Sequence, residues 1–423
     1  MTVRFLKSAK PDSAQQQSSV RDRVLDMLHD IEQGGEAVAL RYASELDDWH
    51  GDVVVSEDEI AAAAARLDPS VRADIEFAHA NIQKFAKAQR ATLLDMEIEM
   101  APGFVAGQRS IPVVSAGCYA PGGRFSHVAS ALMTITTAKA AGVEFVAAAS
   151  PPRGPDGIAD EMVYAMHLAG AQKILCMGGV QAVAAMAFGF FDIPRADVLA
   201  GPGNAWVAEA KRQLYGRVGI DMVAGPTDSL IVADQSADPA VVAWDMVGQM
   251  EHGADSPVWL VTDSSALASG VLALVPELIA TLPASNAKSA TAAWENLAEI
   301  VVCDDREEMA TMADRYAPEH LHVQARDLDW WLTRLRAYGS LFLGAETTVA
   351  FGDKAAGPNH VLPTSGAARY TGGLSVHKFL KTVTWQRATG EAARQVAEVT
   401  ARISRLEGME AHARTADIRL TSR

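Results

Sequence analysis

The sequence contains few cysteines and no long apolar run. Its 423 residues include only three cysteines, Cys118, Cys176 and Cys303, which lie far apart in the chain. Few, scattered cysteines in an odd number are typical of a protein from a reducing compartment without disulfides. No apolar run reaches the roughly 18 residues of a membrane span, and the first 17 residues, MTVRFLKSAKPDSAQQQ, lack an apolar signal core. We therefore expect a cytoplasmic protein with no membrane partner.

Clusters of basic residues are also missing. The chain has 37 Lys and Arg against 52 Asp and Glu, a formal net charge of −15. Because binding to phosphate backbones needs clustered positive charge, we expect no nucleic-acid partner. The remaining balance, 49% hydrophobic and 21% charged, is that of an ordinary globular protein. At roughly 150 residues per domain, the length predicts two or three domains.

Two hydrophobic patterns follow one another along the chain. The first hundred residues predict helices, with Ser56 and Glu59 placed as a capping box and Pro69 placed to open the next helix. From about residue 106, short apolar runs such as FVAAAS (145–150) alternate with amphipathic stretches, a pattern typical of parallel sheet covered on both faces. We divide the chain into a helical N-terminal region (1–105), a first α/β unit (106–235), a second α/β unit (236–365) and a C-terminal helical arm (366–423), in which we find no convincing strand.

Glycine- and proline-rich segments follow several of the expected strands. They are GCYAPGGR (117–124), AGPGNAW (200–206), AGPTDS (224–229) and KAAGPNHVLPT (354–364). Each alone is more often a plain turn, but open α/β folds bind ligands at the carboxyl ends of their strands, so four such segments together indicate a ligand site. AGPGNAW is not a full GxGxxG, yet the helix after it could bind a pyrophosphate on its free N–H groups.

Several histidines lie close in sequence to amide or carboxylate side chains. Three pairs stand out by position: Gln249 with His252, Asp353 with His360, and Glu407 with His412. Histidine nitrogen and carboxylate oxygen are zinc ligands, but neither a two-cysteine nor an HExxH spacing is present. Spacing alone therefore favours ordinary, satisfied histidines over a metal site.

Glu319 and His320 are adjacent within YAPEHLHV, just before an expected strand. Such a pair could divide acid–base work, one residue activating water and the other moving a proton. An exposed acid beside a capping turn explains the same residues equally well. Cys118 has no charged or histidine neighbour in sequence, so we interpret it as structural rather than nucleophilic.

Eight motifs, in order along nearly the whole chain, resemble the histidinol dehydrogenase family. They are YAPGG (119–123), GGVQAVAAMAFG (178–189), GPGNAWVAEAKRQ (201–213), AGPTD (224–228), QMEHGADSPVWLVT (249–262), APEHL (317–321), GD…GPNHVLPT (352–364) and EGMEAH (407–412). The resemblance implies two incomplete Rossmann-like parallel-sheet units. It also implies a homodimer in which the C-terminal arm of one protomer reaches the active site of its partner.

The resemblance further implies a chemistry and a set of residues. The reaction is a four-electron oxidation of a small primary alcohol through its aldehyde to a carboxylate, with one Zn²⁺ and two NAD. The implied zinc ligands are Gln249, His252, Asp353 and His412, and the implied catalytic pair is Glu319 and His320. NAD contacts fall on Tyr119, Gln181 and Asn204, and substrate contacts fall on Thr227, His360 and Glu407.

The chain departs from the usual family pattern at positions implied to lie near the substrate. Thr227-Asp228 replaces Ser-Glu, Ala86 replaces a histidine, and the sequence gains Arg124, His127, His377 and Lys378. These features look like the branch that oxidises 2,3-dihydroxypropane-1-sulfonate to 3-sulfolactate, because a sulfonate favours Arg, Lys or His donors. Arg124 is our first choice of sulfonate ligand. Two alternatives stay open: oxidation of L-histidinol to L-histidine, with the substitutions neutral, and a zinc hydrolase or binding protein that does not use a dinucleotide.

Overall fold

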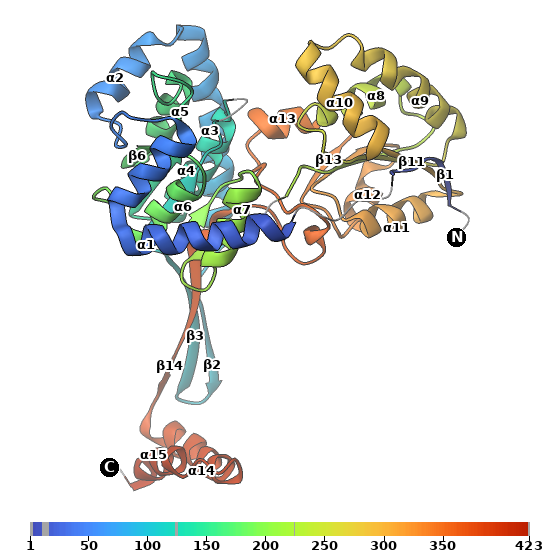
Figure 1. The fold of residues 1–423 in the computed structure, drawn as a ribbon. Coiled ribbons are helices and arrows are strands. Elements are labelled where there is room, and N and C mark those ends of the chain that lie inside the picture. Colours follow the sequence, from blue (N-terminus) through green and yellow to red (C-terminus); the bar gives the residue numbers. More distant parts are fainter. Residues whose placement is uncertain (1–2, 11–16, 123–125, 224, 422–423) are drawn as a thin grey trace.

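The computed structural model describes residues 3–10, 17–122, 126–223 and 225–421 (Figure 1). Two α/β units lie side by side, and a narrow stalk of strands extends from the first unit to a pair of helices at its tip. No helix within the described ranges is long and apolar enough to cross a membrane. The fold is therefore two parallel-sheet units with helical additions, as the sequence predicts.

The first unit is built on a five-stranded parallel sheet in the order β6-β5-β4-β7-β8. Its strands are β4 (Ser115–Tyr119), β5 (Phe145–Ser150), β6 (Lys173–Cys176), β7 (Val198–Ala200) and β8 (Gly219–Ile220). The helices that connect them are α4 (Val128–Ala141), α5 (Asp160–Ala169), α6 (Gly179–Phe188) and α7 (Ala205–Leu214). All four strand pairs are parallel, as expected for strands joined by helical crossovers.

Three N-terminal helices complete the first unit. They are α1 (Gln17–Asp47), α2 (Glu57–Arg66) and α3 (Pro69–Ala91). Helix α1 packs with α6 and α7 on one face of the sheet, and α2 and α3 join α4 and α5 on the other. Gly35 takes a positive φ of 62° and interrupts α1, while the Ser56 hydroxyl caps α2 by accepting from the Glu59 N–H. The capping of α2 by Ser56 is predicted by the sequence.

The second unit repeats the strand order of the first. Its sheet has the order β1-β11-β10-β9-β12-β13, in which only the edge strand β1 is antiparallel. The strands are β1 (Arg4–Lys7), β9 (Ser229–Ala233), β10 (Val258–Thr262), β11 (Glu299–Val302), β12 (His320–Gln324) and β13 (Ser340–Leu343). The helices are α8 (Pro239–Met250), α9 (Ser265–Ile279), α10 (Ala284–Asn296), α11 (Arg306–Tyr316), α12 (Leu328–Arg334) and α13 (Val349–Lys354). Alternate residues of the strands face α8–α10 on one side and α11–α12 on the other.

The stalk is a three-stranded antiparallel sheet in the order β14-β3-β2. Its strands are β2 (Met96–Ala101), β3 (Phe104–Pro112) and β14 (Leu380–Ala388), and its tip carries α14 (Gly390–Leu406) and α15 (Glu410–Thr421). Two short 3₁₀ turns, η1 (Ala367–Arg369) and η2 (Val376–Phe379), precede β14. Figure 1 shows that the stalk holds α14 and α15 away from both units.

Three expectations about the organisation of the chain are wrong in part. The N-terminal region is not wholly helical, because β1 pairs with the distant β11 and β2 pairs with β3. A strand, β14, does follow residue 365. Strand β9, which precedes the expected division near residue 235, is a central strand of the second sheet. The missed strand β1 depends on pairing between distant residues. The missed strand β2 does not, because the alternation of Met96, Ile98 and Met100 is a local strand signal.

Candidate active site

Three segments of the chain meet at the carboxylate of Asp228, directly before β9. One of its oxygens accepts from the Glu319 N–H at 2.6 Å, and the other accepts from the Ser365 N–H at 2.7 Å. In return, the Asp228 N–H donates to the Glu319 carboxylate at 3.3 Å. Asp228 therefore positions the backbone and the side chain of Glu319. The sequence places Asp228 near the substrate only through the family resemblance, and it does not show this positioning role, because the partners of Asp228 are far away in the chain.

Glu319 and His320 are both buried at the amino end of β12, with exposed fractions of 6% and 3%. His320 Nδ1 lies 3.7 Å from Glu319 Oε2, and His320 Nε2 lies 3.4 Å from Asp353 Oδ1. Neither ring nitrogen has a hydrogen-bond partner within the described part of the chain. The alternative of an exposed acid is therefore wrong, because both side chains of the pair are buried.

Burial and mutual charge shift the pKa values of these groups. Burial is the main cause that raises the pKa of Glu319 to about 8, and the nearby Asp228 and Asp353 carboxylates act in the same direction. Burial opposes the charged form of His320, but Glu319 and Asp353 outweigh it and raise the pKa of His320 to about 9. The pKa of Asp353 falls to about 2, because contact with His320 outweighs burial. Shifts of this size and with these causes are typical of functional sites.

Asp353 also connects this pair to His252. Asp353 lies in α13, and its second carboxylate oxygen is 3.8 Å from His252 Nε2. Gln249, three residues earlier at the end of α8, accepts from the Ser229 hydroxyl at 3.1 Å, and Ser229 pairs with His320 across the β9–β12 ladder. Gln249, His252 and Asp353 thus lie around one point at the amino edge of the second sheet.

This donor set fits a zinc ion. Zinc binds histidine nitrogen and carboxylate oxygen at roughly 2.0–2.2 Å in tetrahedral geometry, which places two donors about 3.4 Å apart. The separation of 3.8 Å between His252 and Asp353 is close to that value. Within the described ranges no three His, Cys, Asp or Glu side chains already form a metal-binding group. The remaining implied ligands are the amide of Gln249 and the imidazole of His412.

His412 and Glu407 lie elsewhere in this chain. His412 belongs to α15 and Glu407 ends α14, so both are at the tip of the stalk (Figure 1). Both side chains are exposed. One protomer thus brings Gln249, His252 and Asp353 together, but its own His412 and Glu407 lie away from them.

The loop from 354 to 364 joins the two units beside this site. His360 Nδ1 is 2.8 Å from the Asp353 carbonyl oxygen, and His360 Nε2 is 2.8 Å from the hydroxyl of Ser130 in the first turn of α4. Burial lowers the pKa of His360. Thr227 immediately precedes Asp228 and is half-buried. His360, an implied substrate contact, therefore lies against Asp353, and Thr227, another, lies beside Asp228.

Of the four basic residues expected near a sulfonate, three are described by the structure, and one of these three, His127, lies beside the site. Burial lowers the pKa of His127 to about 4, and His360, Lys354 and His252 are close enough to lower it further. His377 is exposed, and Lys378 donates to the Thr371 hydroxyl at 3.1 Å. Arg124 lies outside the described residues.

The residues implied to contact NAD lie at the carboxyl edge of the first sheet. The hydroxyl of Tyr119, at the end of β4, accepts from the Gly179 N–H at 3.2 Å. Gln181 is in the first turn of α6, and the Asn204 side chain accepts from the N–H groups of residues 206 and 207. Asn204 thus accepts from two N–H groups at the helix N-terminus that the sequence offers to a pyrophosphate.

Close packing fixes the backbone between β7 and α7. Gly201 has a φ of 118°, and a Cβ there would lie 2.0 Å from the Tyr119 carbonyl oxygen. Lys211 donates to the Gly201 carbonyl oxygen, and Asp221 accepts from the Gly201 N–H, each at 2.8 Å. Lys211 and Asp221 are also a buried ion pair. These contacts place the GPGNAW turn against the end of β4.

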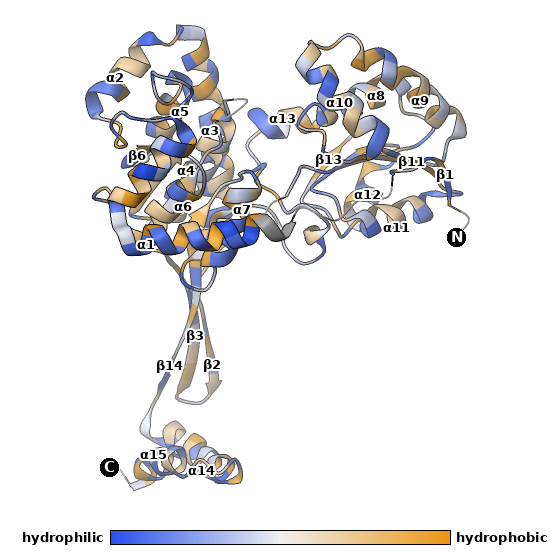
Figure 2. Ribbon diagram, in the orientation of Figure 1, coloured by the Kyte–Doolittle hydropathy of each residue, from blue (hydrophilic) through white to orange (hydrophobic). Residues whose placement is uncertain are grey.

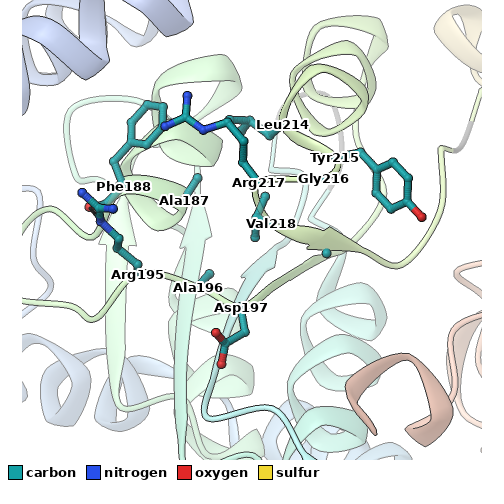
Figure 3. Close-up of a pocket in the computed structure, with 11 residues that line it drawn as sticks. Ala187, Phe188, Arg195, Ala196, Asp197, Leu214, Tyr215, Gly216, Arg217 and Val218 are labelled. Atoms are coloured by element: carbon teal, nitrogen blue, oxygen red, sulfur yellow. Dashed lines mark hydrogen bonds between the residues drawn. The ribbon is translucent and has the colours of Figure 1, made fainter. Parts of the chain in front are cut away.

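Two other features do not belong to this site. A pocket of about 580 Å³ lies at the opposite, amino end of the first sheet, near Asp197 and Gly219, and no residue implied in chemistry lines it (Figure 3). Its Arg217 is already paired with Glu32. Cys118 is buried, and burial raises the pKa of its thiol to about 12, in agreement with a structural role.

Comparison with known proteins assigns the chain to a family. A family model described as histidinol dehydrogenase matches residues 10–420. A sulfopropanediol 3-dehydrogenase from Ruegeria pomeroyi is 60% identical over 99% of this chain and 97% of that protein. A histidinol dehydrogenase homolog from the same organism is 62% identical, with the same coverage of both chains. The crystal structure of histidinol dehydrogenase from Elizabethkingia anophelis superimposes with a TM-score of 0.91 at 32% identity, covering 97% of this chain and 94% of that one.

These similarities define a dehydrogenase that acts on CH–OH donors and oxidises an alcohol through its aldehyde. The chain belongs to the histidinol dehydrogenase family.

Proposed function

We propose that this protein is a cytoplasmic, zinc- and NAD-dependent enzyme that oxidises 2,3-dihydroxypropane-1-sulfonate to 3-sulfolactate. The observation that carries the chemistry is the buried Glu319–His320 pair, which contacts Asp353 beside His252. The similarity to a protein named sulfopropanediol 3-dehydrogenase supports the substrate. Family membership argues against a hydrolase or a binding protein that does not use a dinucleotide.

The two acid–base residues act in different steps of this proposal. His320 accepts the proton of the substrate hydroxyl when hydride leaves the carbon, and Glu319 then deprotonates the water that attacks the aldehyde. Gln249, His252, Asp353 and His412 would hold the Zn²⁺, which would supply stabilisation of negative charge on the substrate oxygen. Accepting a proton requires neutral His320. A cation on Asp353 favours that form, because it withdraws negative charge that otherwise raises the pKa of His320.

NAD binds at the carboxyl edge of the first sheet in this proposal, where Tyr119, Gln181 and Asn204 lie. This edge is where open parallel sheets accept nucleotides. The contact between Ser130 of α4 and His360 joins this edge to the acid–base centre of the second unit. The cofactor and the substrate can therefore meet between the two units.

We expect the purified protein to contain one Zn²⁺ per protomer. His252→Ala removes a nitrogen ligand, so it should lose most of the zinc, and activity should fall by more than about a hundredfold. Elemental analysis of the wild-type and variant proteins measures this. His29→Ala, an exposed position on α1, is the matched control and should retain the metal. Full zinc content in His252→Ala, or activity that survives a strong chelator, would contradict the assignment.

The active site is proposed to be completed by a second copy of the chain. Small residues of α14 pack against α15, while Val396, Val399, Ile403 and Leu406 are exposed. Three apolar side chains of β2 are exposed as well, and hydrophobic residues are visible along the stalk and on its terminal helices (Figure 2). Exposed apolar surface of this extent marks an interface. A partner subunit that covers it would bring Glu407 and His412 of one chain to the site of the other.

Subunit mixing tests the shared site. His252→Ala and His412→Ala should each inactivate a homodimer, but a mixed dimer has one site with both lesions and one intact site. Random exchange makes half of all dimers mixed, so activity should recover to about a quarter of the wild-type value. A mixture of His252→Ala with Asp353→Ala is the control and should stay inactive, because both changes lie in the body of the protomer. No recovery after verified exchange would favour a site built within one chain.

The division of labour between Glu319 and His320 predicts different kinetic defects. Glu319→Gln should retain more of the alcohol-to-aldehyde step than of the aldehyde-to-acid step. His320→Ala should slow the first step by about 10²–10⁴-fold, the usual contribution of a general base. Single-turnover measurements that start from alcohol and from aldehyde separate the two steps. Equal losses in both steps for both variants would show that the roles are not divided in this way.

The identity of the substrate is tested by offering different alcohols to the purified, zinc-replete enzyme. The measurement is the amount of NADH formed per substrate consumed. We expect kcat/KM for 2,3-dihydroxypropane-1-sulfonate to exceed that for L-histidinol by well over about tenfold, because a charge-assisted hydrogen bond contributes about 1.5–3 kcal/mol. Arg124→Gln should lower turnover of the sulfonate far more than turnover of a neutral diol. A preference for L-histidinol would instead support the histidinol reaction.

A further inference from the structure

A carboxylate from α1 reaches the carboxyl edge of the first sheet and contacts Gln181. Asp47 is the last residue of α1, and one of its oxygens accepts from the Gly178 N–H at 2.8 Å and from Gln181 Nε2 at 2.9 Å. Gln181 is only 1% exposed. Because an ionised carboxylate accepts hydrogen bonds but cannot donate them, the amide nitrogen of Gln181 must face Asp47. The carbonyl oxygen must then point the other way.

That carbonyl oxygen has no hydrogen-bond partner among the described residues. Oε1 of Gln181 is buried and makes no hydrogen bond to any described residue, and the hydroxyl of Ser150, at the carboxyl end of the neighbouring strand β5, is in the same condition. Leaving a buried acceptor unsatisfied costs about 1–3 kcal/mol. Buried polar atoms without a protein partner are uncommon, and each calls for an explanation such as a bound ligand or water. Two of them at one sheet edge indicate a place for a polar ligand.

We propose that Asp47 is a positioning residue that makes Gln181 a hydrogen-bond acceptor for a donor group of the dinucleotide. The inference rests on the proposed binding of NAD at this edge. NAD carries three kinds of neutral donor: the amino group of adenine, the amide of nicotinamide and the ribose hydroxyls. Each can donate to a carbonyl oxygen, whereas a reversed Gln181 amide would present N–H donors in place of that acceptor. Asp47 therefore selects the orientation in which the cofactor is recognised.

Binding of NAD and its analogues to the enzyme without substrate tests this proposal. Calorimetry would compare NAD with analogues that each lack one donor, namely the hypoxanthine, acetylpyridine and deoxyribose dinucleotides. In the wild type, one analogue should bind roughly tenfold more weakly than NAD, the value of one hydrogen bond. In Asp47→Asn the new amide can donate to Gln181 and allow it to reverse. NAD should then bind about tenfold more weakly, while that analogue should lose nothing further.

Two further variants make the outcome specific. Asp30→Asn, on the same helix, changes an aspartate that accepts from the Tyr42 hydroxyl, and it should bind NAD like the wild type. Gln181→Met preserves side-chain length but removes the acceptor. It should therefore lose the discrimination between NAD and that analogue, even if Asp47→Asn does not fold.

Several results would overturn the role of Asp47. They are unchanged NAD affinity in Asp47→Asn, equal weakening of NAD and all analogues, or a wild type that distinguishes none of them. A wild type that binds no NAD at all would instead refute the proposed cofactor.

Discussion

The geometry of the candidate site depends on the carboxylate of Asp228. It accepts hydrogen bonds from the backbone N–H groups of Glu319 and Ser365, which lie roughly one hundred residues away in the chain. Those contacts fix Glu319, whose neighbour His320 contacts Asp353, and Asp353 in turn contacts His252. Asp228, Glu319, His320 and Asp353 are buried, whereas His252 is exposed. The charges of the four buried groups are therefore offset by one another rather than by water. Removing the first carboxylate would release the backbone that presents the acid–base pair.

Local signals allowed much of the fold to be predicted from the sequence. Continuous apolar runs bounded by glycine and proline became the parallel strands, and the capping residue Ser56 begins α2 as expected. The adjacent Glu319 and His320 could be identified from their residue types, although their burial could not. The implied set Gln249, His252 and Asp353 came from the family resemblance, and the structure places the last two 3.8 Å apart.

The features that could not be predicted from the sequence depend mainly on contacts between distant residues. Strand β1 pairs with β11 almost three hundred residues later, and no local pattern specifies that partner. Asp47 is an ordinary acidic residue in sequence, and Asp228 stands out only through the family resemblance. Only the tertiary fold shows that each of them accepts two hydrogen bonds. Strand β14 is a different kind of error, because the β-branched run Thr382-Val383-Thr384 is a local strand signal.

The two α/β units share a strand order but present opposite edges to the proposed reaction. In the first unit, the carboxyl edge carries the residues implied in NAD binding. In the second unit, the corresponding edge between β9 and β12 is blocked by Asp234, whose carboxylate accepts from the N–H groups of Ser236 and Arg326. A carboxylate at this edge occupies the place where a phosphate would bind, and its negative charge repels a phosphate. In the proposed function, the second unit instead uses its amino edge, where Glu319 precedes β12 and His320 begins it. In the proposed function, the same fold therefore provides a nucleotide-binding edge in one unit and an acid–base and metal edge in the other.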